Sequence, residues 1–282
     1  MPNPFLDFPI RGEKISMRVQ IRQEIADVHT AFQHIRIVET EALGKILLLD
    51  GHVQLATLDE RAYHEALVHI PILSLENPGR ALVVGGGDGG VLRELVKHEA
   101  LERIDMVEID AGVVDTCRKH LPELSNGAFD DPRVQLHIAD AFGFMKQVSK
   151  PYDFMVLDIT DVYEGEDGAL SEQLFTPEFY DDCRRALAPD GMLVTQADNH
   201  VFCPYSMEGI IAALKPHFEK LGSYQALVPS FGGYSAYVWA SQSSEVQKEF
   251  PQTKAARLDL AYLSETTWRL AGESLLFAKL QR

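Results

Sequence analysis

The chain has 282 residues, of which 46% are hydrophobic and 24% charged, and its formal net charge is −16. This composition is typical of a globular protein, and the length allows one large domain or two unequal ones. The acidic balance disfavours nucleic acid and anionic membranes as partners and favours cationic ligands.

The sequence also bears on compartment and metal content. No apolar run approaches the roughly 18 residues that a membrane span needs, and the opening "MPNPFLDFPIRGEK" lacks a signal-peptide pattern. We therefore expect a cytoplasmic protein with no membrane partner. The three cysteines, Cys117, Cys183 and Cys203, are widely spaced, which argues against a disulfide framework or a zinc cluster. We interpret them as buried apolar side chains and expect no metal.

The amino-terminal part alternates hydrophobic and polar residues. Period two runs from about residue 14 to 57, in "MRVQIRQEI", "FQHIRIVET" and "KILLLDGHVQLAT". Asp50 and Gly51 mark a tight hairpin turn. We expect a small antiparallel β-sheet domain over residues 1–62.

The remainder, residues 63–282, alternates helices with short, nearly unbroken apolar strands. The strands are "RALVVG", "RIDMVEI", "VQLHIA", "YDFMVLDI" and "GMLVTQA", and strands of this kind are buried on both faces of a parallel sheet. "YQALVPSF" and "YSAYVWAS" flank a Gly-Gly turn and are expected to pair antiparallel at an edge. The predicted fold class is α/β, with a Rossmann-like, doubly wound, mostly parallel sheet after the small β domain.

A glycine run lies between the first of these strands and a helix, in "VVGGGDGGVLREL". Such loops bring backbone N–H groups close to a ligand and usually cradle phosphate, with Gly85 and Gly87 as candidate contacts here. Asp88 in the same loop would repel a pyrophosphate but would hold a sulfonium or an ammonium. We interpret the loop as a site for the adenosyl part of a sulfonium compound.

An acid lies at or just after the carboxyl end of each of the first four predicted parallel strands. The set comprises Asp88, Glu108, Asp140, Asp158 and Asp161. Ligands bind at the carboxyl ends of the strands in open parallel sheets, and Glu108, twenty residues beyond Asp88, has the spacing of an acid that accepts from ribose hydroxyls. Any one of these acids could instead cap a helix.

These motifs together resemble a known family. "LLLDGHVQLATLDERAYHEALVHIPIL", "VVGGGDGGVLREL", "MVEIDAGVVDTCRKHLPE", "FDDPRVQLHIADAFGFM", "YDFMVLDITD" and "LFTPEFYDDCRRALAPDGMLVTQ" are similar to segments of the spermidine synthases, which are polyamine aminopropyltransferases. The resemblance implies the fold of class I adenosylmethionine enzymes, a homodimer, and decarboxylated S-adenosylmethionine as co-substrate, with no metal.

The resemblance also implies how the donor is held. Asp88 and Asp158 would bind its aminopropyl ammonium. Intact S-adenosylmethionine would bring its own carboxylate against them, and one like-charge contact at roughly 4 Å costs about 4 kcal/mol at an effective dielectric constant of 20. Discrimination would therefore come from repulsion. Glu108 would bind the ribose. The other implied donor contacts are Asp140 and Ala141 at the adenine amino group, and Gln33, Gln54 and His64 around the donor.

The implied chemistry is an in-line displacement by an uncharged primary amine. A free amine with a pKa near 10 is mostly protonated at neutral pH, so a base must remove a proton. By resemblance Asp158 is that base, Tyr63 supports it, and Asp161 holds the acceptor.

The acceptor region departs from the family pattern. Val162 stands in a proline position within the longer "DITDVYEGEDGALSEQLF", and Phe231 stands where putrescine-using members carry a tyrosine. Leu58 and Arg61 also differ at the acceptor entrance. Putrescine conversion to spermidine with release of methylthioadenosine is the first hypothesis. The alternatives are a spermine or thermospermine synthase, an S-adenosylmethionine methyltransferase, and an inactive polyamine-binding relative.

Overall fold

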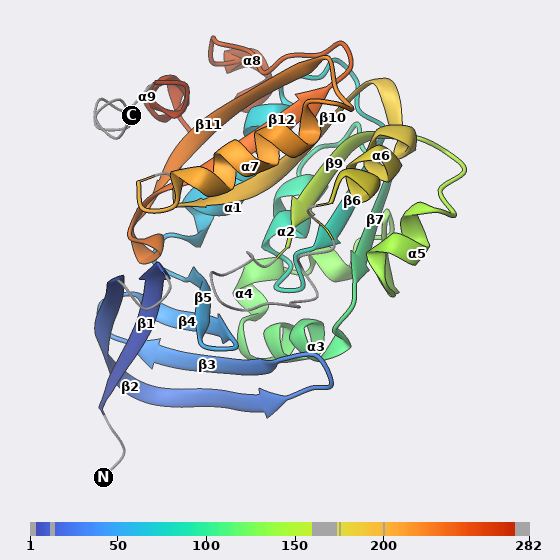
Figure 1. The fold of residues 1–282 in the computed structure, drawn as a ribbon. Coiled ribbons are helices and arrows are strands. Elements are labelled where there is room, and N and C mark those ends of the chain that lie inside the picture. Colours follow the sequence, from blue (N-terminus) through green and yellow to red (C-terminus); the bar gives the residue numbers. More distant parts are fainter. Residues whose placement is uncertain (1–3, 12–14, 160–173, 175, 200, 274–282) are drawn as a thin grey trace.

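The computed structural model describes residues 4–11, 15–159, 174, 176–199 and 201–273, and it contains two sheets (Figure 1). The smaller sheet holds five strands in chain order, and the larger holds seven. This agrees with the predicted fold class of a small antiparallel sheet followed by a mostly parallel α/β sheet.

The small sheet is antiparallel throughout. Its strands are β1 (Phe5–Arg11), β2 (Ile15–His29), β3 (His34–Thr40), β4 (Gly44–Leu49) and β5 (His52–Ala56). Asp50 and Gly51 form the predicted hairpin turn, with φ values of 50° and 86°. Two residues with positive φ are the requirement of a type I′ turn, which explains the Asp-Gly pair.

Strand β1 was not predicted, because the period-two pattern was recognised only from about residue 14. Pro4 and Pro9 interrupt that pattern in "PFLDFPIR". Proline is tolerated on an edge strand, where its missing N–H leaves no ladder position empty, and β1 is at the edge of the sheet.

The seven-stranded sheet has the order β11-β12-β10-β9-β6-β7-β8. Its strands are β6 (Arg80–Gly85), β7 (Arg103–Glu108), β8 (Val134–Ile138), β9 (Tyr152–Asp158), β10 (Leu187–Asn199), β11 (Lys220–Val228) and β12 (Gly233–Ser241). Strands β6 to β10 are parallel, whereas β12 pairs antiparallel with both β10 and β11. The predicted antiparallel pair is therefore present, although only β11 is at the edge.

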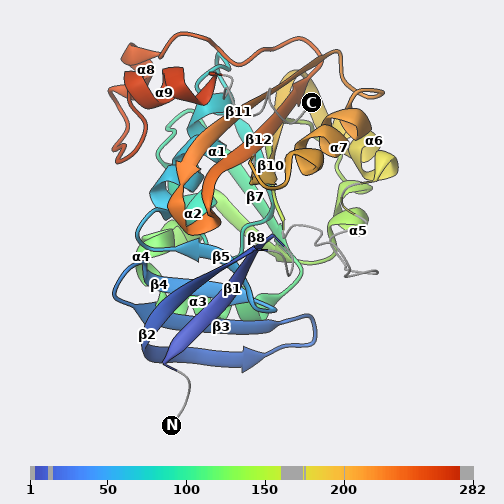
Figure 2. The same ribbon diagram turned by 60° about the vertical axis from the view of Figure 1, so that its left-hand side comes forward.

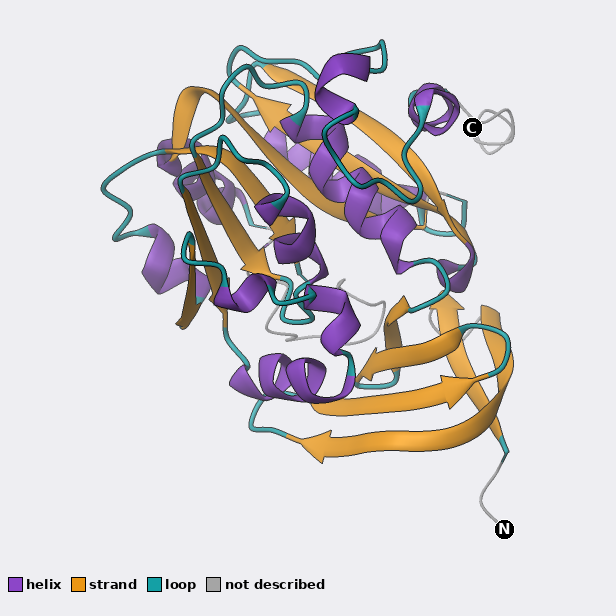
Figure 3. Ribbon diagram, turned by 180° about the vertical axis from the view of Figure 1, so that it is seen from behind, coloured by secondary structure: helices purple, strands orange, loops and turns teal. Residues whose placement is uncertain are grey.

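Helices cover both faces of this sheet (Figures 2 and 3). The helices of the described residues are α1 (Glu60–Ile72), α2 (Gly90–Val96), α3 (Ala111–His120), α4 (Pro122–Ser125), α5 (Ala141–Met145), α6 (Pro177–Ala186), α7 (Pro204–Leu214), α8 (Gln252–Ala255) and α9 (Glu265–Ala271), with short 3-10 helices at Ala128–Asp130 and Pro229–Phe231. One apolar core holds side chains of α1, α2 and α9, and the other holds side chains of α5, α6 and α7. Burial on both faces explains why the parallel strands are apolar without alternation.

The two sheets are joined through α3. Val113 and Cys117 of this helix pack against Ile35, Ile37 and Leu47 of the small sheet. The helix follows β7 of the large sheet directly, so this packing sets the small sheet against the carboxyl ends of the parallel strands.

Three smaller predictions are also addressed by the fold. All three cysteines are buried thiols outside any disulfide. No helix in the described ranges is both long and apolar enough to cross a membrane. Helix α1 begins at Glu60, so the predicted division between residues 62 and 63 would fall within its first turn, and that division remains a prediction.

Candidate active site

A cavity of about 660 Å³ lies between the small sheet and the carboxyl ends of the parallel strands. Most of the predicted site residues line it: Gln33, Gln54, Tyr63, Gly85, Gly87, Asp88, Glu108, Asp140, Ala141, Asp158 and Phe231. His64 lies directly behind Asp88, with Nε2 3.4 Å from a carboxylate oxygen. Asp161 lies outside the described residues. The roles assigned to all these residues remain predictions.

The glycine loop passes very close to the end of β9. Gly85 has a φ of 78°, and a Cβ on it would collide with the carbonyl oxygen of Asp158. The N–H of Gly86 donates to that same oxygen at 2.9 Å. The close approach and the positive φ both require glycine, and they place this loop over the carboxyl end of β9.

Asp158 lies at the carboxyl end of β9, in the cavity wall. The hydroxyl of Tyr63 donates to its Oδ1 at 2.6 Å. Burial and the nearby charge of Asp88 raise the pKa of Asp158 to about 6, against the opposing effects of His64 and the Tyr63 hydrogen bond. Two carboxylates close together in a buried site favour a cation between them.

His64 is buried, and both of its ring nitrogens face carboxylates. Nδ1 is 2.6 Å from Oε2 of Glu60, and Nε2 faces Asp88. Burial alone would lower the pKa of His64, but Asp88 and Glu60 together raise it to about 10. Its contacts with two carboxylates therefore favour the imidazolium form at neutral pH.

This protonation state bears on metal binding. His64, Asp88 and Asp158 each bring one atom within 4.8 Å of the others, a separation that could also suit a metal ion. An imidazolium has no lone pair to donate, so a metal would have to displace its proton. The cluster as it stands suits an organic cation better than a metal.

Glu108 lies at the end of β7, and β6 separates this strand from β9 in the sheet. Burial and the neighbouring charges of Asp110 and Asp158 raise its pKa to about 7, although backbone N–H groups hydrogen-bond to it. One of these bonds, from the N–H of Asp110, measures 2.9 Å. A buried carboxyl beside a glycine loop can accept hydrogen bonds from ligand hydroxyls.

Asp110 is a site neighbour that the sequence reasoning missed. Its carboxylate caps α3 by accepting from the N–H of Gly112, and it also accepts from the side chains of Thr30 and Gln33 at 2.8 and 2.9 Å. The Gln33 side chain is thereby held by the residue that caps α3, just after β7. The adjacent acids in "EID" were a signal that could have drawn attention to it.

Asp140 has a helix-capping role in this structure. Its carboxylate accepts from the N–H groups of Phe142 and Gly143 at the start of α5. Capping fixes the carboxylate at the cavity edge beside Ala141, and a carboxylate has lone pairs for a further donor. Asp140 therefore caps a helix, the alternative role of any one of these acids, and its remaining lone pairs are still available to a ligand donor.

Phe231 contributes an aromatic ring to the cavity wall. It packs edge-on to Tyr63, with ring centroids 5.6 Å apart. Gln196 of β10 also lines the cavity and donates to the carbonyl of Ile159 at 2.9 Å. Gln196 was not predicted, although it lies one residue beyond the part of β10 that pairs with β9, and the same strand-end argument would have found it.

The geometry defines a class of protein: an α/β enzyme with a glycine loop, a buried acid for hydroxyls and paired acids for a cation. Comparison with known proteins extends this. Residues 60–250 match the model of the spermine/spermidine synthase domain, and residues 10–57 match that of the spermidine synthase tetramerisation domain.

Relatives agree with these matches. A polyamine aminopropyltransferase of Sodalis glossinidius is 41% identical over 82% of this chain and 79% of its own length. One from Pyrobaculum aerophilum is 35% identical over 82% of this chain and 80% of its own. The chain belongs to the spermine/spermidine synthase family and is an aminopropyltransferase of polyamine biosynthesis.

Solved structures resemble the whole fold. A spermidine synthase in complex with the transition-state analogue AdoDATO superposes with a TM-score of 0.91 at 27% identity, covering 100% of this chain and 95% of that one. The spermidine synthase of Thermotoga maritima gives a TM-score of 0.88 at 27% identity, covering 100% and 94%.

Proposed function

We propose that the enzyme transfers the aminopropyl group of decarboxylated S-adenosylmethionine to putrescine, forming spermidine and releasing methylthioadenosine. The observation that carries this proposal is the placement of Asp88 and Asp158, whose carboxylates lie within 4.8 Å of each other beside the glycine loop. A donor with an ammonium and no carboxylate suits this pair, whereas an amino-acid carboxylate would be repelled.

Most of the remaining donor contacts are assigned to residues that line the cavity. Glu108 accepts from the ribose hydroxyls, and Asp140 with the backbone of Ala141 contacts the adenine amino group. Gln33 and Gln54 close the site from the small sheet. His64 acts from behind Asp88, and Gly85 and Gly87 give the ligand room to approach the backbone.

The reaction is a displacement at the aminopropyl carbon bonded to sulfur. The lone pair of the acceptor amine forms the new N–C bond, the C–S bond breaks, and its electron pair neutralises the sulfonium as methylthioadenosine leaves. The amine loses one proton, which Asp158 accepts. The raised pKa of Asp158, about 6, narrows its gap to an amine pKa near 10 and so improves proton transfer.

For the acceptor amine, one specific observation favours an alternative to putrescine. Phe231 contributes an apolar ring to the cavity wall and has no hydroxyl that could bind a short diamine. This favours a longer amine such as spermidine as the second candidate. Asp161 is proposed to hold the acceptor's distal charge in either case.

We also propose an oligomer built through residues 10–57, since the family model matching this segment is described as a tetramerisation domain. The homodimer expected from the sequence and a tetramer are distinguished by light scattering coupled to gel filtration.

The proposed reaction is tested by mass spectrometry of products. The enzyme is incubated with decarboxylated S-adenosylmethionine and, separately, putrescine, cadaverine, agmatine and spermidine. Spermidine and methylthioadenosine in equal amounts from putrescine support the first proposal. Product only from spermidine would favour the second, and methylated product from S-adenosylmethionine alone would overturn both.

A further inference from the structure

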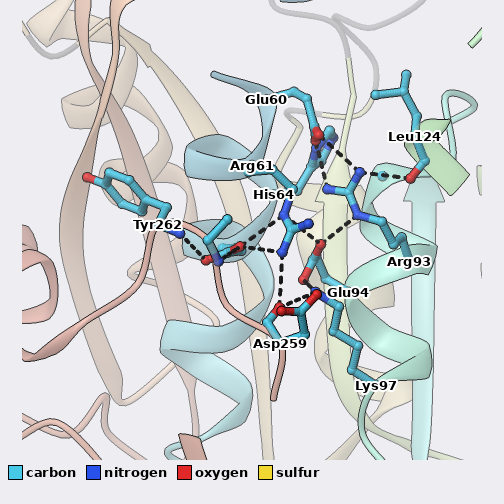
Figure 4. A network of polar contacts seen from close by, with 12 residues as sticks. Glu60, Arg61, His64, Arg93, Glu94, Lys97, Leu124, Asp259 and Tyr262 are labelled. Carbon is cyan, nitrogen blue, oxygen red and sulfur yellow. Dashed lines mark hydrogen bonds and ion pairs between the residues drawn. The ribbon is translucent and has the colours of Figure 1, made fainter. Parts of the chain in front are cut away.

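A chain of buried charges runs from Asp88 into the interior behind the cavity. Figure 4 shows its interior part, with Glu60, His64 and Arg93. His64 lies between Asp88 on the cavity side and Glu60 on the interior side, and Glu60 and His64 are both in α1, one helical turn apart. Their contact, 2.6 Å between Nδ1 and Oε2, is the shorter of the two contacts of the ring. The imidazole is therefore oriented from behind.

Glu60 is itself held by a rigid partner. Both of its carboxylate oxygens accept from Arg93 of α2, at 3.0 and 2.7 Å, and Arg93 also donates to the carbonyl of Leu124. A bidentate guanidinium pair fixes the plane of a carboxylate as well as its charge. Glu60 is thus aimed at His64 by a second helix.

The glycine loop is shaped around the imidazole. A Cβ on Gly90 would collide with the His64 ring, and the N–H of Gly90 donates to Oδ1 of Asp88 at 2.7 Å. The start of α2 therefore admits the ring on one side and fixes Asp88 on the other. This independent feature places His64 beside the proposed donor ammonium site.

The groups facing His64 and Asp158 determine their charges. Around His64 are Glu60 and Tyr63 of α1, Asp88 of the glycine loop and Asp158 of β9. A further set faces Asp158: its charge also acts on Glu108 of β7 and on Tyr237 of β12. His64 is the cation in this set, so it offsets acids on both sides.

We propose that Glu60 is a positioning residue that keeps His64 as an imidazolium against Asp88 and thereby keeps Asp158 ionised at neutral pH. The inference rests on the proposed function, since it concerns the acid that we propose as base. Its consequence is directional: if the charge of Glu60 is removed, His64 loses its proton at a lower pH, and Asp158 then loses the positive charge that favours its ionised form.

The test uses Glu60→Gln, which keeps size and removes charge, and measures turnover from pH 5.5 to 9 with saturating donor and amine. Removing an opposite charge within about 4–6 Å should lower the pKa of His64 by about 1–3 units from about 10, so that Asp158 loses its positive neighbour closer to neutral pH and the acidic limb moves upward. Activity lost at pH 7 should return at higher pH. Glu94→Gln is the matched control, because Glu94 is also buried and also pairs with Arg93, at 2.7 Å.

A second readout does not depend on activity. In protein labelled with ¹⁵N-histidine, His64 is assigned by the signal that disappears in His64→Gln. We expect both ring nitrogens to remain protonated from pH 6 to 9 in the unaltered protein and to titrate about 1–3 pH units lower in Glu60→Gln. This spectrum of the unaltered protein tests the inference even if Glu60→Gln fails to fold.

The outcomes separate the two proposals. A neutral His64 at pH 7 in the unaltered protein overturns the inference, as does an unmoved acidic limb in folded Glu60→Gln or an equal shift in Glu94→Gln. Absence of aminopropyl transfer by the unaltered protein would instead overturn the proposed function, and the charge of His64 would still be read from the spectrum.

Discussion

The hydroxyl of Tyr63 donates a 2.6 Å hydrogen bond to Oδ1 of Asp158 and so ties α1 to the carboxyl end of β9. The bond occupies one oxygen of the proposed base and lowers the pKa of Asp158, in opposition to burial and Asp88. Because Tyr63 also packs against Phe231, one side chain contacts both the proposed base and the aromatic ring in the cavity wall.

Tyr63→Phe tests this link. Hydrogen bonds to charged groups contribute about 1.5–3 kcal/mol, so we expect turnover to fall by about ten- to a hundredfold and the acidic limb to move upward. Steady-state rates across pH measure both. Tyr237→Phe is the control, since that buried ring packs 5.7 Å from Tyr63. Equal losses in the two variants would mean that only packing was disturbed.

Asp158→Asn and Asp161→Asn distinguish the proposed base, Asp158, from the residue proposed to hold the acceptor amine, Asp161. Loss of Asp158 should reduce turnover at least about a hundredfold, or about 2.7 kcal/mol, because its effect falls on the transition state. Loss of Asp161 should chiefly raise KM for the amine. Rates are compared after thermal melts establish folding, and near-normal turnover in Asp158→Asn would refute its role as base.

The pH profile of kcat/KM for the donor should reflect the two raised carboxyl pKa values of the free enzyme. Glu108, with a pKa of about 7, and Asp158, with a pKa of about 6, are charged only above those values. Activity should therefore fall as pH drops through 7 and then 6, approaching a slope of two protons. Glu108→Gln should retain one proton of that slope. A profile that stays level down to pH 5 would contradict this assignment.

Phe231→Tyr tests whether this position in the cavity wall discriminates between short and long acceptor amines. Because the new hydroxyl could accept from or donate to a short diamine, we expect KM for putrescine to fall more than KM for spermidine. The ratio of the two KM values, measured in one buffer, is the readout. An unchanged ratio would remove Phe231 from acceptor choice.

Much of the site could be predicted because strand order brings the carboxyl ends of parallel strands to one edge. Asp88, Glu108 and Asp158 follow three such strands, so their meeting required only the fold class. The glycine loop could also be predicted from the sequence, since Gly85 has a backbone conformation that a side chain would strain.

Other parts depend on contacts that local patterns do not encode. Glu60 and Arg93 read as ordinary charges on two helices, and only the packing of α1 on α2 turns them into a buried pair behind His64. Strand β1 was missed because Pro9 within it and Pro4 before it interrupt the alternation. Tertiary placement decides such cases, whereas sequence periodicity decides the main elements.

The central claim, that paired acids select a donor without a carboxylate, is tested most directly by calorimetry. Binding of decarboxylated and intact S-adenosylmethionine is measured for the unaltered enzyme and for Asp88→Asn, in which the amide oxygen still accepts from the N–H of Gly90. We predict at least tenfold tighter binding of the decarboxylated donor by the unaltered enzyme, a difference of about 1.4 kcal/mol, and a smaller ratio in the variant. Equal affinities of the unaltered enzyme for the two compounds would contradict the claim.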